Sequence, residues 1–143
     1  MPEQTFKPGD RTYFGSDSLT HPNGASFEDD GETGYFYALD LTRSDNMIVD
    51  AVQIYNVANV SDRERESALS ILWSADGMNC ALLINGHPHA AFDFAAKRGC
   101  CRTNFPNLPN TPSGCWDSSD HQWSDEPIAW YRVVTEGLSV IHS

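Results

Sequence analysis

The sequence is poor in positive charge and has no long apolar run. It holds 9 Lys and Arg residues against 20 Asp and Glu residues, which gives a formal net charge of -11 at pH 7. A surface with this balance repels phosphate groups, so binding to nucleic acid or to an anionic membrane is not expected. No stretch approaches the roughly 20 apolar residues of a membrane-spanning helix. Residues 1–10 are polar, which indicates no signal peptide and favours a cytoplasmic location.

Motifs for catalysis or cofactor binding are also missing. The chain has no G-x-S-x-G, no P-loop and no G-x-G-x-x-G, so we predict neither a catalytic residue nor a cofactor. Its four cysteines, Cys80, Cys100, Cys101 and Cys115, include no C-x-x-C pair. Because nothing marks the chain as secreted, we expect reduced thiols, with Cys80 as a small core residue.

What the chain does have suits one folded domain, residues 1–143. Hydrophobic residues make up 40% and aromatic residues 11% of the sequence, which is too rich for a disordered chain. The clearest local signal is a meander in residues 68–94. Apolar and polar residues alternate there in three runs, separated by Asp76-Gly77 and Asn85-Gly86. Asx-Gly pairs between alternating runs predict antiparallel strands joined by tight turns.

Further strands are predicted at residues 12–15, 25–28, 35–41 and 47–57, the last in preference to a helix. Residues 95–99 suggest a helical turn ended by Gly99, and the prolines of residues 104–114 indicate a long surface loop. A helix is expected from Asp125, capped by Ser124 and ended by Gly137. The predicted fold class is therefore α+β, an antiparallel sheet of roughly six strands with one C-terminal helix.

The most conspicuous candidate site is the acidic cluster of Glu28, Asp29, Asp30 and Glu32. These carboxylates could contact Lys and Arg residues of a partner, bind a hard cation, or belong to an ordinary solvated hairpin. The charge is localised, because residues 12–62 carry nine acidic residues and one basic residue, and residues 103–131 carry four acidic residues and none that is basic. A localised negative field is what steers a basic partner.

A second candidate site combines His87, His89 and Asp93. On a regular strand these residues share one face, and two histidines with one carboxylate would suit zinc or non-haem iron. The alternative is that they are ordinary surface residues, since Pro88 separates the histidines and the pattern is short. A zinc site from Cys100, Cys101, Cys115 and His121 is weaker still, because vicinal cysteines are poor tetrahedral ligands.

Several segments resemble a family of small uncharacterised bacterial proteins, classed as a domain of unknown function. They are FEDDGETGYFYALD (27–40), IYNVANV (54–60), WSADG (73–77), ALLIN (81–85), FDFAA (92–96) and CRTNFP (101–106). The resemblance implies no activity and no site residue. Small acidic bacterial proteins are often immunity proteins, which is an analogy of size and charge alone.

The leading hypothesis is a non-enzymatic domain that binds a basic protein, such as an immunity-type inhibitor of a toxin domain. Its contact surface is predicted at Glu28, Asp29, Asp30 and Glu32. The alternative is a metal-dependent enzyme or small-molecule binder using His87, His89 and Asp93. A homo-oligomer formed through an exposed sheet edge is a third possibility.

Overall fold

The computed structural model describes residues 3–44, 47–61 and 64–101, and these ranges contain nine β-strands. The strands are β1 (Glu3–Phe6), β2 (Thr12–Asp17), β3 (Asn23–Asp29), β4 (Thr33–Asp40), β5 (Ile48–Asn56), β6 (Ser67–Trp73), β7 (Asn79–Ile84), β8 (His87–Asp93) and β9 (Arg98–Cys101). The only helical element in these ranges is the 3-10 turn Val57–Asn59.

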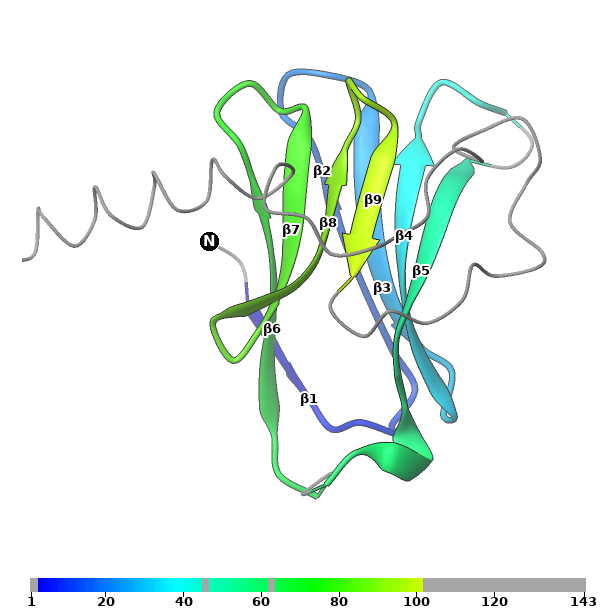
Figure 1. Ribbon diagram of the computed structural model, residues 1–143, viewed down its shortest axis with the longest axis vertical. Coiled ribbons are helices and arrows are strands. Elements are labelled where there is room, and N and C mark those ends of the chain that lie inside the picture. The colour runs from blue at the N-terminus through cyan, green and yellow to red at the C-terminus, as the bar shows by residue number, and fades with distance from the viewer. Residues whose placement is uncertain (1–2, 45–46, 62–63, 102–143) are drawn as a thin grey trace, which may run out of the picture.

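The strands form two antiparallel sheets that pack face to face as a β-sandwich (Figure 1). One sheet has the order β1-β6-β7-β8-β9 and the other the order β2-β3-β4-β5. The chain crosses between the sheets after β1, and it crosses back after β5. Each sheet therefore turns one face inward and one face away from the core.

The core lies between the two sheets and is rich in phenylalanine. Phe27 and Phe36 project from the four-stranded sheet, Phe92 projects from the five-stranded sheet, and all three are fully buried. The rings of Phe36 and Phe92 stack across the sandwich with their centroids 4.8 Å apart. Such aromatic pairs bury much apolar surface, and their stacking adds to the stabilisation.

The predicted meander is confirmed as β6, β7 and β8. Asn85 and Gly86, which join β7 to β8, both have positive φ (54° and 81°), as a primed hairpin turn requires. In the loop between β6 and β7, the Asp76 carboxylate accepts hydrogen bonds from the Ser74 hydroxyl and the Met78 N–H. The strand prediction for residues 47–57 is also confirmed, as β5.

The predicted fold class, α+β with about six strands, is wrong. The described residues are almost entirely strand, arranged in two sheets rather than one. Strand β1 was not predicted, and Gly99 lies within β9 instead of ending a helical turn. The helix expected from Asp125 and the proline-rich loop of residues 104–114 lie outside the described residues.

Three cysteines are described, Cys80, Cys100 and Cys101, and all three are buried. Cys80 is a core residue as predicted, and burial raises the pKa of its thiol. Cys101 also faces the core, where its thiol donates to the Gln53 carbonyl at 3.3 Å. Cys100 lies on the opposite face of its sheet, beside Ala81, Leu83 and Ala91. Cys115 lies outside the described residues.

Replacing Phe92 by alanine tests the role of the inter-sheet aromatic contact. Removing a fully buried phenylalanine from a core costs about 3–5 kcal/mol, so we expect Phe92→Ala to lower the free energy of unfolding by that amount in urea. Leu19→Ala is the control, because Leu19 is 100% exposed and its loss should change little. A loss below about 1 kcal/mol in Phe92→Ala, close to that of a surface substitution, would contradict this packing.

Candidate functional site

The acidic cluster predicted from the sequence lies in the hairpin between β3 and β4, but its carboxylates do not share one surface. Glu28 and Asp29 are the last two residues of β3 and point to opposite faces of the sheet. Asp30 and Glu32 lie in the turn and are exposed. The cluster therefore contains one buried carboxylate, two carboxylates at the turn and one on the outer sheet face.

Asp29 is the buried member, with 1% of its surface exposed. Its Oδ2 accepts hydrogen bonds from the Gly9 N–H at 2.8 Å and the Tyr55 hydroxyl at 2.6 Å. Its Oδ1 accepts one from the Gly31 N–H at 2.8 Å. Three donors thus satisfy a carboxylate that would otherwise be costly to bury. The prediction that Asp29 contacts a partner is therefore not supported, because its side chain is occupied inside the protein.

The sequence of β4 explains how Tyr55 reaches Asp29. Gly34 pairs with Asp29 of β3 on one side and with Tyr55 of β5 on the other. A Cβ at Gly34 would lie 2.6 Å from the Tyr55 ring, so a side chain there would collide with it. The missing side chain lets the ring lie across β4 and donate to Asp29. Burial, together with this bond, raises the pKa of Tyr55, so its hydroxyl stays a donor.

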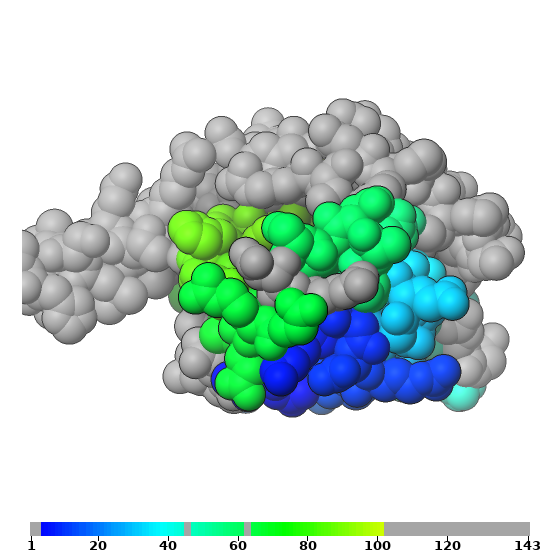
Figure 2. All heavy atoms as spheres, turned by 90° about the horizontal axis from the view of Figure 1, so that it is seen from below, coloured from blue at the N-terminus to red at the C-terminus, as the bar shows by residue number. Residues whose placement is uncertain are grey.

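The hydrogen bonds of Asp29 join three segments at one end of the sandwich. Figure 2 shows this end, with the β1–β2 connection in blue, the β3–β4 hairpin in light blue and the segment after β5 in green, side by side. The Val57 N–H also donates to the Glu32 carbonyl at 2.8 Å, which fixes the hairpin to the end of β5. The hairpin is therefore held in place rather than projecting freely.

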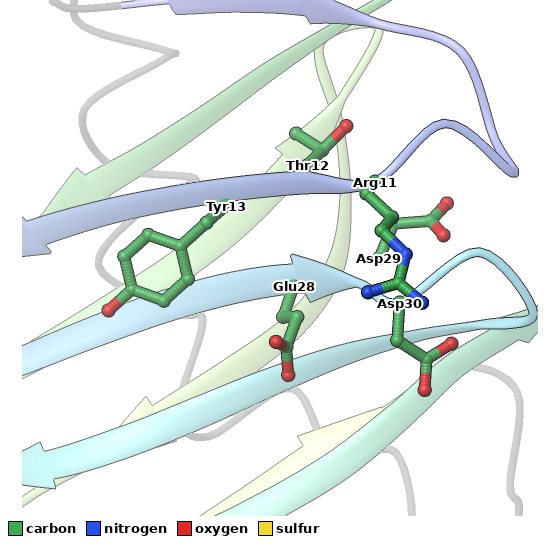
Figure 3. A pocket seen from close by; sticks show the side chains of 6 residues that line it. All are labelled: Arg11, Thr12, Tyr13, Glu28, Asp29 and Asp30. Atoms are coloured by element: carbon green, nitrogen blue, oxygen red, sulfur yellow. The ribbon is translucent and has the colours of Figure 1, made fainter.

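Asp30 shapes the turn itself. Its Oδ1 accepts hydrogen bonds from the N–H groups of Glu32 and Thr33, both at 2.9 Å, as in an Asx turn. These bonds are the main cause that lowers the pKa of Asp30. Arg11 extends toward Asp30 from just before β2 and lowers this pKa further (Figure 3). Arg11 therefore offsets part of the negative charge at this point of the surface.

Glu28 faces outward from the four-stranded sheet among tyrosines. It pairs directly with Tyr13 on β2 and with Tyr35 on β4. The Tyr37 hydroxyl donates to Glu28 Oε1 at 2.9 Å, and the rings of Tyr35 and Tyr37 stack with centroids 6.0 Å apart. Burial and this hydrogen bond raise the pKa of Tyr37. The Tyr37 hydroxyl therefore stays protonated and donates to the Glu28 carboxylate.

Beside Glu28 the outer sheet face is hollowed into a groove of about 370 Å³. We call it the tyrosine groove, and its lining includes Tyr13, Glu28, Tyr37, Leu39, Met47 and Ile48. Tyr13 is 64% and Met47 is 43% exposed, so the groove presents two large exposed side chains together on one face. A smaller hollow of about 220 Å³ adjoins it, shares Tyr13 and Glu28, and includes Arg11, Asp29 and Asp30 (Figure 3).

The second predicted site, at His87, His89 and Asp93, is not assembled as a metal site. A β-bulge between Leu82 and Leu83 shifts the pairing of β7 with β8, because Leu82 pairs with Ala90 but Leu83 pairs with Pro88. The strict alternation assumed for this strand is therefore interrupted. In the described ranges, no three His, Cys, Asp or Glu side chains lie close enough together to hold a metal ion. Two members of the alternative zinc set, Cys115 and His121, lie outside these ranges.

The tyrosines of the groove were not predicted as site residues. The run Tyr35-Phe36-Tyr37 does carry a signal, since its alternation separates a buried phenylalanine from two partly exposed tyrosines. Tyr13 and Met47 lie far from this run in the sequence. Only the pairing of β2, β3, β4 and β5 brings them beside Glu28.

Fold and site together define an acidic β-sandwich with an aromatic groove on one outer face. A model of the family described as "Uncharacterized protein conserved in bacteria (DUF2251)" matches residues 6–132, so the chain belongs to this family. An uncharacterized protein of Haemophilus influenzae is 49% identical over 80 residues, which are 56% of this chain and 50% of that protein. The match thus spans about half the length of this relative. No solved structure matches the chain. Within the described residues, no helix has the length and apolar character to cross a membrane.

Removing the Tyr55 hydroxyl tests whether Asp29 is a structural residue. A hydrogen bond to a charged group contributes about 1.5–3 kcal/mol, so Tyr55→Phe should lower the free energy of unfolding by that amount in urea denaturation. Tyr13→Phe removes the same atom from an exposed ring and is the matched control. Equal stability of the two variants would show that the bond to Asp29 contributes nothing.

Proposed function

We propose that this protein is a non-enzymatic binding domain that recognises a basic protein, and that it acts as an immunity-type inhibitor of a bacterial toxin domain. The observation that carries the proposal is the outer face of the four-stranded sheet. Exposed tyrosine and methionine side chains surround a fixed carboxylate there, and two exposed carboxylates lie at its edge. Protein-binding surfaces are enriched in aromatic residues and methionine, and opposite charges favour encounter.

The contact residues differ from the four predicted from the sequence. Glu28, Asp30 and Glu32 remain as the acidic contacts, because each has exposed surface. Asp29 is excluded by its burial and its three hydrogen bonds. The net charge of -11 adds a long-range attraction for a basic partner, which salt should screen.

Neutralising the exposed acidic contacts tests the binding surface. The triple variant Glu28→Gln, Asp30→Asn and Glu32→Gln keeps the side-chain shapes and removes three negative charges. For a partner captured from the source lysate and then purified, we expect at least about tenfold weaker binding by calorimetry. The partner should be basic, and its affinity for the wild-type protein should fall as salt rises.

A matched control separates contact from net charge. Ala75→Lys, Ala95→Lys and Ala96→Lys change the charge by the same three units at exposed positions in the turns of the other sheet. We expect this variant to bind nearly as well as the wild type. If both triple variants lose affinity equally, the contact surface is misplaced. If the partner does not arrest growth when expressed alone in a bacterial host, or if co-expression of this protein does not restore growth, the inhibitor role is wrong.

A further inference from the structure

The tyrosine groove offers one kind of charge to a ligand. Glu28 is the acidic residue in its lining, and among the described residues that line it there is no Lys or Arg. Arg11 belongs to the adjoining hollow, on the side of Asp30. A cation in the groove would therefore meet the Glu28 carboxylate with no Lys or Arg among the described lining residues, while Arg11 and Glu28 both line the adjoining hollow.

The carboxylate of Glu28 is oriented by its neighbours. Tyr37 donates to Oε1, and among the described residues no donor is found for Oε2. Because Tyr37 keeps its proton, this bond fixes the carboxylate without supplying a counter-charge. Holding a side chain in place before binding reduces the entropy lost on association.

Apart from Ser26, the remaining lining is apolar or aromatic and suits the stem of a long side chain. Leu39, Ile48 and Met47 lie along the groove, and Tyr13 lies on the other side of Glu28. A volume of about 370 Å³ is near the lower end of the range of small-ligand pockets, roughly 300–1,000 Å³. A single amino-acid side chain matches this scale better than a large ligand does.

We infer that the tyrosine groove is the recognition pocket for an arginine side chain of the basic partner. This inference rests on the proposed protein-binding function and names the chemistry of one contact within it. The guanidinium group pairs with Glu28 and lies against the Tyr13 ring, and the methylene stem covers Leu39, Ile48 and Met47. Arginine fits better than lysine, because a planar guanidinium group both stacks on aromatic rings and donates two parallel hydrogen bonds to a carboxylate.

Peptide titrations followed by two-dimensional NMR test the pocket directly. The probes are the blocked tripeptides Gly-Arg-Gly, Gly-Lys-Gly and Gly-citrulline-Gly, the last being neutral but similar in shape to arginine. We expect saturable shifts at the amides of Tyr13, Glu28 and Tyr37 with the arginine peptide, weaker binding of the lysine peptide and none of the citrulline peptide. Glu28→Gln should weaken arginine binding about tenfold.

Glu66→Gln is the matched control, since it removes one exposed carboxylate that lies outside the groove and outside the proposed contact surface. It should leave the dissociation constant of the arginine peptide within about twofold of the wild-type value. No saturable shift, shifts outside the groove, or equal losses in Glu28→Gln and Glu66→Gln would each overturn the arginine pocket. The proposed function would stand in those cases if the triple neutralisation still weakened partner binding, and it would fall if that neutralisation had no effect.

Discussion

The buried carboxylate of Asp29 is the constraint on which the arrangement of the acidic hairpin depends. It binds the β1–β2 connection through Gly9, its own hairpin through Gly31, and β5 through Tyr55. These segments come from distant parts of the sequence, and they meet at one end of the sandwich (Figure 2). A buried carboxylate is costly to leave without its donors, so the native fold is most stable when all three are in place. Asp29 therefore couples the folding of the hairpin to that of the sheet.

Because side chains alternate along β3, the inward position of Asp29 also determines which residue lies on the outer face of the sheet. Since neighbouring residues of a strand face opposite sides, fixing Asp29 inward places Glu28 outward, opposite Tyr13 and Tyr35. Tyr37 then holds the Glu28 carboxylate from the next strand. A shift of one residue in β3 would exchange the two carboxylates and leave an unpaired charge in the core. The register of β3 that gives Asp29 its hydrogen-bond donors in the interior is therefore also the register that places Glu28 in the tyrosine groove.

Local sequence patterns predicted the strands better than their assembly. Asn85-Gly86 marked a turn correctly, because its backbone preference is local. No local signal distinguishes a strand of one sheet from a strand of the other, so the two-sheet sandwich was missed. The acidic cluster was identified from the sequence. The number of acidic residues in it, however, does not show that Asp29 is buried and Asp30 is exposed. That difference arises from Gly34, whose missing side chain lets Tyr55 cross to Asp29.

The central claim is that the buried Asp29 carboxylate stabilises the fold through its hydrogen bonds, while its neighbour Asp30 is a surface residue. Replacing each of the two by asparagine tests this claim most directly. Asp30 accepts both of its turn hydrogen bonds on Oδ1, so Asp30→Asn can keep them. Asp29 accepts bonds on both oxygens, so Asp29→Asn must set an NH2 group against a buried donor. In urea denaturation, Asp29→Asn should lower the free energy of unfolding by about 1–3 kcal/mol or more, and Asp30→Asn by no more than about 0.5 kcal/mol. Equal, small losses in the two variants would contradict the role assigned to Asp29.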